Sequence, residues 1–122
     1  MTEETYLAAN IYIETMEDTA VPIIAMNSLL EQMRFGSFST AVDNQTFIDV
    51  HLLYGTSTKV SQNTSIGRWR ITGIPPLPAR TPNITVTVYA YVTGEVNIAA
   101  FLNKSQRLEA IPQTVPNRVP VR

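Results

Sequence analysis

Few residues in this sequence could do acid–base or metal chemistry. His51 is the single histidine, and Asp49 precedes it by two positions, so the two side chains would share one face of a strand. An imidazole beside a carboxylate becomes a catalytic base only next to a nucleophile, and no residue pattern points to one. We therefore interpret His51 as a surface histidine beside a carboxylate.

An acidic turn is the one candidate for a metal site. Glu14, Glu17 and Asp18 would offer carboxylate oxygens, which Ca²⁺ prefers, but a solvated turn explains them more simply. The chain has no cysteine, which excludes disulfides, thiol nucleophiles and thiolate metal ligands. Its five glycines are dispersed and form no phosphate-binding loop. We predict a protein that is not an enzyme and that holds no metal or cofactor of its own.

The composition is that of one globular domain. The chain has 122 residues, 44% of them apolar and 16% charged, so it can bury a single core. Its net charge of −1 does not favour a nucleic-acid surface or a polybasic membrane patch. No apolar run approaches the roughly 18 residues of a membrane span, and the polar, acidic N-terminus is not a secretory signal. We expect a cytoplasmic protein without nucleic-acid or membrane partners.

The dominant hydrophobic pattern has period two, which predicts strands. The clearest strand covers residues 84–92, and residues 96–102 resume the alternation after Thr93-Gly94, so the two predict a hairpin. Trp69 is expected to face inward, and Tyr89 and Tyr91 to be exposed. Further strands are predicted at residues 10–16, 20–24, 34–42, 47–54 and 68–71.

The number and spacing of these segments define the fold class. Seven or eight short strands predict an all-β fold, an antiparallel β-sandwich. Residues 57–65 form a polar loop, and residues 73–82 a proline-dense one. We divide the chain into a sandwich at residues 1–111 and an extended proline-rich tail at 112–122, because three prolines in the tail exclude a helix or a central strand there.

Several motifs stand in one order along these strands. They are Ile-Glu-Thr-Met at residues 13–16, Phe-Ser-Thr-Ala-Val-Asp-Asn-Gln at 38–45, Ile-Thr-Gly-Ile-Pro-Pro at 71–76 and Pro-Asn-Ile-Thr-Val-Thr at 82–87. Together they resemble the substrate-binding β-sandwich of the Hsp70 chaperone family, over about residues 11–111 and without insertions. The resemblance implies a domain that holds extended apolar peptide segments of unfolded proteins.

The resemblance also implies a site. The family's peptide pocket matches Ile13, Phe38, Ile48, Val50 and Ile84, and its arch over the bound backbone matches Met16 and Ala41. From the pattern alone, apolar residues at alternate strand positions are ordinary core. The two interpretations differ in whether these side chains converge on an open groove or on a closed core.

The sequence departs from the family where the family couples peptide binding to ATP. Residues 2–7 stand where the family has an apolar linker to its ATPase domain, and the proline-rich tail stands where it has a helical lid. The family's Gly-Gly turn is Glu17-Asp18 here, and Glu95 replaces an apolar residue. We therefore expect peptide holding without an ATPase domain or a lid in this chain, so that ATP is no cofactor of it.

Three alternatives stay open. The tail ends in Arg-Val-Pro-Val-Arg at residues 118–122, an apolar core between arginines, so it could fill the pocket of a neighbouring molecule or be a disordered end. The sandwich could have kept the fold for structure or assembly and lost peptide binding. A carbohydrate-binding sandwich ranks third, with Tyr89 and Tyr91 as its exposed aromatic candidates.

Overall fold

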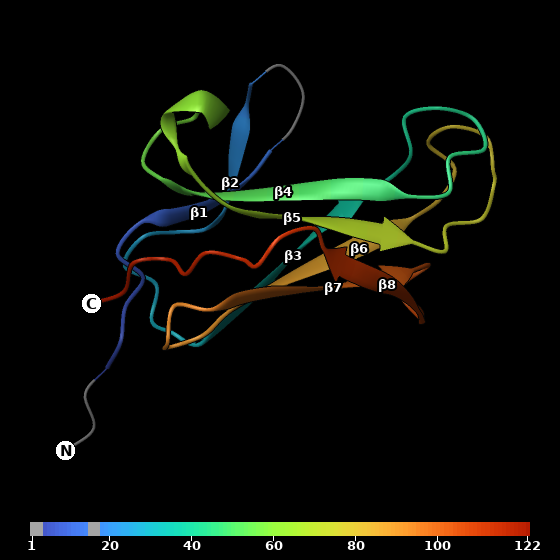
Figure 1. The fold of residues 1–122 in the computed structure, drawn as a ribbon. Helices are drawn as coiled ribbons and strands as arrows, with labels where there is room; N and C mark the ends of the chain where they lie inside the picture. Colours follow the sequence, from blue (N-terminus) through green and yellow to red (C-terminus); the bar gives the residue numbers. More distant parts are fainter. Residues whose placement is uncertain (1–3, 15–17) are drawn as a thin grey trace.

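The fold consists of antiparallel strands joined by loops (Figure 1). The computed structural model describes residues 4–14 and 18–122. The strands are β1 (Asn10–Glu14), β2 (Ala20–Ile24), β3 (Gln32–Phe38), β4 (Ile48–Gly55), β5 (Thr64–Thr72), β6 (Ile84–Ala90), β7 (Val96–Leu102) and β8 (Gln106–Pro112). A short 3-10 helix, η1 (Val60–Gln62), lies between β4 and β5. Every strand pair is antiparallel, so the predicted all-β antiparallel sandwich is confirmed.

The strands form two layers that one strand joins. Their order is β2-β1-β4-β5-β8-β7-β6-β3, and in Figure 1 the first four lie above the last four. β8 belongs to both layers, because its last residues pair with β5 and its first residues with β7. β2 and β3 are the two ends of this order, so the sheet bends round at β8 and stays open between them.

Alternate burial along the strands builds the core. In β6, Ile84, Val86 and Val88 are fully buried, as the alternation of this segment predicts. Trp69 is also fully buried, so its inward orientation is confirmed. Tyr89 is half-buried and not exposed, because it lies within the β3–β6–β7 part of the sheet. Apolar side chains from both layers therefore form one main core.

β3 begins and ends earlier than the predicted strand at residues 34–42. It stops at Phe38 because the next residues bond to the proline-dense loop and not to a neighbouring strand. The Arg80 amide donates to the Thr40 carbonyl at 3.0 Å, and the Ser39 hydroxyl donates to the Pro82 carbonyl at 2.6 Å. These contacts join distant parts of the chain, so no local pattern reveals them.

Two more differences follow from weak or broken alternation. β5 begins at Thr64, before the predicted residues 68–71. Leu52 pairs with Gly67 and Leu53 with Ser65, so Ile66 is an extra residue in β5, and the burial of both Ile66 and Gly67 breaks the alternation there. β8 was not predicted, because Leu108 is the one fully buried residue in it. A single buried residue produces no period.

The segment after β8, residues 113–122, packs on its own molecule, and the first residue of the predicted tail, Pro112, pairs with Trp69 as the last residue of β8. Figure 1 shows the segment running back from β8 towards the N-terminal segment. Val119 is buried in the core, and the tail backbone is hydrogen-bonded to its own sandwich. These backbone bonds join Gln113 to Arg68, Asn117 to Ile66, Val119 to Gly94, Pro120 to Ala8, and Arg122 to Tyr6. The tail is therefore not a disordered end, and in this arrangement it is not free to enter a neighbour's pocket.

Gly94 allows the tail to approach this closely. Its φ is +85°, a region that side chains disfavour, and a Cβ at this position would lie 2.5 Å from the carbonyl oxygen of Val119. The β6–β7 turn and the tail therefore depend on each other, since any side chain at residue 94 would displace the tail backbone.

Candidate functional site

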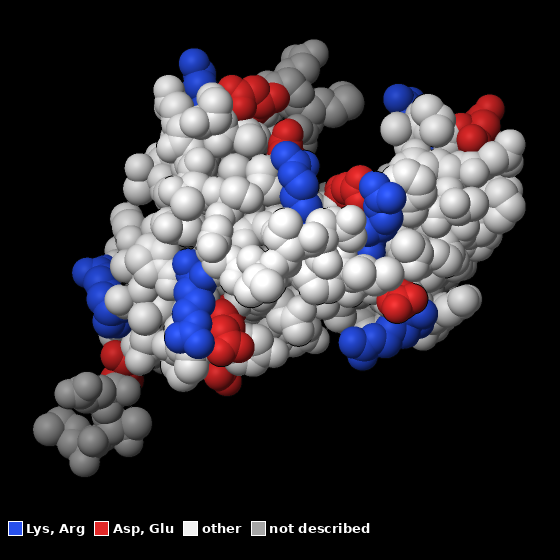
Figure 2. Space-filling model, in the orientation of Figure 1, with Lys and Arg blue, Asp and Glu red and all other residues white. Residues whose placement is uncertain are grey.

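A cavity of about 220 Å³ opens between the ends of β1 and β3 and the segment that joins β3 to β4, residues 39–47. Figure 2 shows that the surface is hollowed on this side, between β2 and the 39–47 segment, and that charges of both signs are mixed over this face. The residues that line the cavity are Ile13, Glu14, Phe38, Ser39, Ala41, Gln45, Ile48, Asp49 and Val50. Its apolar members come mainly from the strands, and its polar members are Glu14 of β1, Asp49 of β4, and Ser39 and Gln45 of the 39–47 segment, which forms the rim of the cavity.

The cavity lies beside the first half of β4. The described residues of β1 pair with β4 from Asn10 and Gly55 to Ile13 and Leu52, and the cavity-lining residues Val50 and Ile48 precede Leu52 in β4. Their side chains point to the same face of the strand. β3 ends beside them at Phe38, which closes the cavity from the second layer.

The structure brings five of the seven predicted site residues together around this cavity: Ile13, Phe38, Ala41, Ile48 and Val50. Ile84 does not line it. Ile84 is fully buried and pairs with Phe38 across the β3–β6 ladder, so it supports the cavity wall from behind. Met16, the other predicted arch residue, lies outside the described residues. Peptide contact by these residues stays a prediction.

Sequence reasoning did not name the polar rim residues. Gln45 holds the 39–47 segment from inside: its Oε1 accepts from the Ala41 amide at 2.9 Å and from the Val42 amide at 3.3 Å. Its Nε2 donates to the Phe47 carbonyl at 2.6 Å. Gln45 is the last residue of the motif at residues 38–45, and this was the available signal for a role at the site. The motif alone does not reveal that its side chain bonds the backbone of this segment.

The proline-dense loop holds the same segment from outside. The Asn44 amide donates to the Leu77 carbonyl at 2.9 Å, and the Ala79 amide donates to Asp43 Oδ1 at 2.8 Å. Thr40 is buried between the two segments. A rim that is fixed in this way loses little conformational entropy when a ligand binds, so it is preorganised.

One ion pair lies at the mouth of the cavity. Arg70 donates from Nε to Asp49 Oδ1 at 2.9 Å and from Nη2 to Asp49 Oδ2 at 3.1 Å, and its guanidinium stacks 4.2 Å from the ring centroid of Phe47. The hydrogen bond to Asp49 raises the pKa of Arg70, so the guanidinium stays charged at physiological pH. Asp49 lines the cavity and Arg70 does not, so Arg70 bonds the two carboxylate oxygens from outside the cavity.

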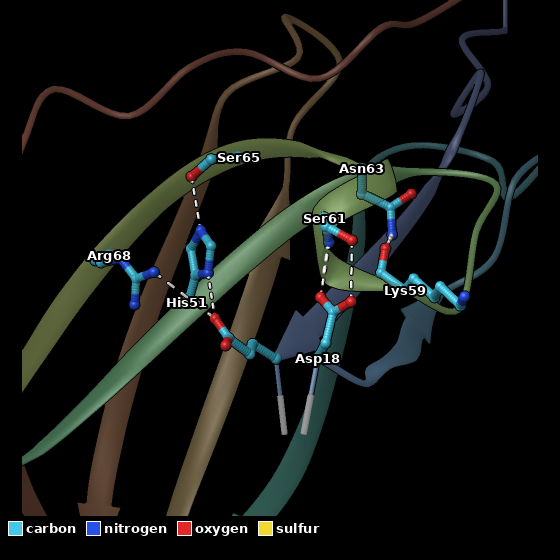
Figure 3. Close-up of polar contacts among 8 residues, drawn as sticks. Asp18, His51, Lys59, Ser61, Asn63, Ser65 and Arg68 are labelled. Carbon is cyan, nitrogen blue, oxygen red and sulfur yellow. Dashed lines mark hydrogen bonds and ion pairs between the residues drawn. The ribbon is translucent and has the colours of Figure 1, made fainter. Parts of the chain in front are cut away.

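His51 contacts a different carboxylate from the one that the sequence suggested. It is 8% exposed, so it is not a surface histidine, and its Nδ1 lies 2.6 Å from Glu14 Oε1. Its Nε2 lies 2.7 Å from the Ser65 hydroxyl (Figure 3). The expected Asp49 partner is taken by Arg70. Spacing within one strand could not reveal the Glu14 contact, because it crosses from β4 to β1.

The order carboxylate, imidazole, hydroxyl is also that of hydrolase triads. Here the carboxylate residue, Glu14, lines the cavity, and the hydroxyl residue, Ser65, does not. Arg68 Nη2 lies 3.7 Å from the same Glu14 oxygen. The arrangement therefore holds the Glu14 carboxylate in place at the cavity, and Ser65 does not line the cavity.

The acidic turn is anchored by hydrogen bonds. The Asp18 carboxylate accepts from the Ser61 amide at 2.8 Å and from the Ser61 hydroxyl at 2.9 Å, which ties the β1–β2 connection to η1 (Figure 3). Glu17 lies outside the described residues. Within residues 4–14 and 18–122, no group of three His, Cys, Asp or Glu side chains could hold a metal ion, and no helix is long and apolar enough to cross a membrane.

The fold and the cavity define a class of protein: an antiparallel β-sandwich with a small apolar cavity below a fixed polar rim. The family model described as "Hsp70 protein" matches residues 7–120, so the chain belongs to the Hsp70 family. The chaperone protein DnaK of Methanothermobacter thermautotrophicus is 36% identical over 107 residues, which are 88% of this chain and 18% of DnaK. The chain therefore corresponds to less than a fifth of that relative's length.

Proposed function

We propose that this domain holds an extended apolar segment of an unfolded protein, with one apolar side chain in the cavity beneath the rim. The observation that carries the proposal is the convergence of Ile13, Phe38, Ala41, Ile48 and Val50 on one open cavity. Ile13, Ile48 and Val50 are buried in the core, and together with Phe38 and Ala41 they also border a space that opens to the surface.

The size of the cavity favours a single side chain. At about 220 Å³ it is larger than an engineered protein cavity of about 150 Å³ that takes up benzene, so a leucine or phenylalanine side chain fits. It is smaller than the roughly 300 Å³ at which sites for drug-sized ligands begin. The ligand is therefore the side chain of a longer molecule.

The energetics favour weak, exchangeable binding. Burial of a leucine-sized side chain contributes about 1.5–3 kcal/mol. Main-chain hydrogen bonds to rim groups such as the Ser39 hydroxyl add affinity without reading sequence. The ordering of a flexible peptide offsets part of this gain. We expect a dissociation constant in the micromolar range, which corresponds to about −8 kcal/mol.

The proposal is one of binding and not of catalysis. The described groups around the cavity hold one another: Glu14 with His51, Asp49 with Arg70, and Gln45 with the rim backbone. Peptide holding by this domain needs no ATP. A cytoplasmic location is part of the proposal, since a chain without cysteine suits a reducing compartment.

The test is a titration of a fluorescent seven-residue peptide, with one central leucine and a flanking arginine, followed by anisotropy. Val50→Phe should fill the cavity and abolish saturable binding. Because overpacking can cost about 1–3 kcal/mol, thermal unfolding is measured alongside. Val92→Phe is the matched control: the same change at an exposed position that does not line the cavity should leave binding intact.

Two outcomes decide the proposal. Micromolar binding that Val50→Phe abolishes in a folded domain, and that Val92→Phe retains, supports it. A folded native domain that binds no peptide at high micromolar concentration contradicts it, and the sandwich would then serve structure or assembly.

A further inference from the structure

Residues 113–122, the part of the tail that follows β8, are held on the sandwich at two places with an unsupported stretch between them. Directly after β8, the Gln113 amide donates to the Arg68 carbonyl at 2.8 Å. The next bond comes from the Asn117 amide, which donates to the Ile66 carbonyl at 2.8 Å. Within the part of the chain that the structure describes, no hydrogen bond involves residues 114–116. These three residues are the hinge of the tail.

The hinge is also poorly packed. Val115 is 91% exposed, although it is a large apolar residue. A cavity of about 270 Å³ lies between the tail and the start of β7, and the residues that line it are Glu95, Val96, Val115, Pro116, Asn117 and Arg118. Neither hydrogen bonds nor buried side chains therefore fix the course of the hinge.

Residues 117–122 are the docked part of the tail. Val119 is the one buried side chain in this part, and its amide donates to the Gly94 carbonyl at 2.8 Å. Two backbone bonds, of 2.7 and 2.9 Å, join Arg122 to Tyr6. The docking contacts are thus mainly backbone bonds to separate parts of the sandwich, together with one apolar anchor. Residues 117–122 of a second copy of this chain would make the same contacts.

We propose that two copies of this chain form a dimer in which each copy docks its residues 117–122 on the sandwich of the other. Exchange of an identical element is a low-cost route to a dimer, because the docking contacts are kept and only the hinge changes its course. The dimer goes beyond the proposed function, since it uses neither the peptide cavity nor its rim.

The exposed Val115 gives the exchange a driving force. In a symmetric dimer, the two copies use the same surface patch, and equivalent residues meet at the twofold axis. The two hinges cross at this axis when the tails are exchanged. Val115 of one copy then packs on Val115 of the other, and the burial of this apolar surface favours the dimer.

Sedimentation of the native chain at rising concentration tests whether the dimer forms. A short linker gives the tail of the same copy an effective concentration in the mM range, so the mass should rise from one chain to two at about 0.1–1 mM. Val115→Ser removes the contact at the axis and should shift this rise severalfold to higher concentration. A native chain that stays a monomer throughout this range overturns the proposal.

Val42→Ser is the matched control for Val115→Ser. Val42 is also exposed, at 61%, but it lies in the 39–47 segment and does not line the cavity beneath the hinge. This variant should dimerise like the native chain. Thermal unfolding at low concentration should be unchanged in both variants, because each substitution replaces an exposed side chain. If both variants weaken the dimer equally, Val115 does not lie at the axis and the proposal is wrong.

Cysteine cross-linking tests whether the tails are exchanged. The chain has no cysteine, so two introduced cysteines report on one contact. Arg118 Nη2 lies 3.4 Å from Glu95 Oε1, and both side chains are largely exposed, so the loss of this pair should cost little stability. One copy carries Glu95→Cys, and a second copy carries Arg118→Cys and an affinity tag. After a short bismaleimide is added to the mixture, capture by the tag should recover a product that contains one copy of each.

Two controls calibrate the cross-link. A chain with both substitutions should cross-link within itself at low concentration, because its own docked tail brings the two cysteines together. Lys104→Cys takes the place of Glu95→Cys in the second control, since Lys104 is exposed and follows β7, whereas Glu95 precedes it. The Lys104→Cys and Arg118→Cys copies should give severalfold less of the two-chain product at the same concentration.

The outcomes separate exchange from other ways of pairing. If the Glu95→Cys copy cross-links no better than the Lys104→Cys control, the dimer is built by another surface and the exchange is wrong. Val50→Phe fills the peptide cavity and should leave the dimer intact. If Val50→Phe dissociates the dimer, the tail of one copy enters the peptide cavity of the other, and the exchange is also overturned. Peptide titrations are read separately, so the failure of one proposal leaves the other standing.

Discussion

The cavity under the rim and the apolar groove between the edge strands β2 and β3 share Ile13 and Phe38 but are built in opposite ways. Around the cavity, polar side chains and backbone groups from two loops fix the 39–47 segment by hydrogen bonds. Around the groove, the walls are strand side chains, and the space remains because two sheet edges do not pair. The cavity is therefore preorganised by long-range polar contacts. The groove remains because β2 and β3, the two ends of the strand order, do not pair with each other.

The comparison teaches that apolar surface alone does not make a selective site. The groove has the more exposed apolar side chains, Phe35 and Val21. None of the described side chains that line it is charged. The cavity has a smaller volume but has groups that can bond a peptide backbone. We expect the cavity, and not the groove, to decide whether a segment binds.

The largest expected effect comes from a change that should leave both spaces alone. Gly94→Ala puts a Cβ into a positive-φ position and 2.5 Å from the Val119 carbonyl oxygen, so it should displace the tail. Strain of this kind costs about 1–3 kcal/mol. Urea unfolding should show the loss, while the affinity for the peptide with one central leucine stays constant below the transition. An unchanged urea midpoint would show that the tail does not stabilise the domain.

Gln45→Ala should affect the cavity and not the groove. It removes the acceptor for the Ala41 and Val42 amides and the donor to Phe47, so the rim loses its internal support. With net values of about 0.5–1.5 kcal/mol for such bonds, partly replaced by water, we expect about a fivefold loss of affinity for the single-leucine peptide. Anisotropy titration measures it. Gln62→Ala in η1 is the control, and equal losses in both variants would contradict a specific role of the rim.

The smallest effect is expected from Arg70→Gln. The Arg70–Asp49 pair is exposed to solvent, and such pairs contribute little to stability. Peptide affinity should change by less than about twofold, because the Asp49 carboxylate can be solvated instead. Titrations at low and high sodium chloride should converge, since salt screens exposed charges. A tenfold loss that persists at high salt would show that this pair shapes the cavity itself.

Much of the architecture could be predicted from local pattern. Residues 84–92 alternate without a break, and the structure forms β6 there with Ile84, Val86 and Val88 inward. Trp69 was placed inward correctly. β8 was missed because Leu108 is the one fully buried residue in it, which leaves no period to detect. Predictions succeeded where a strand is half-buried and regular, and failed where pairing alone defines the strand.

The polar contacts could not be predicted in this way. His51 was paired with Asp49 because the two share a strand, but the structure pairs it with Glu14 on β1 and Ser65 on β5. For the tail, the prolines exclude a helix and a central strand but do not reveal its contacts, and the structure bonds its backbone to the sandwich and buries Val119. Both contacts depend on which strands become neighbours, and local spacing carries no information on that.

The amino-acid sequence by itself determined the family, the fold class and those strands that alternate regularly, such as β6, because period-two alternation and turn residues act over a few positions. Only the tertiary structure decided that Val50 and Ile48, which are buried in the core, also line a cavity. That outcome depends on the position of the 39–47 segment, which the proline-dense loop holds through contacts such as the one from the Ala79 amide to Asp43. Whether an apolar strand residue is core or pocket depends on what covers it, and the covering residues are distant in the chain.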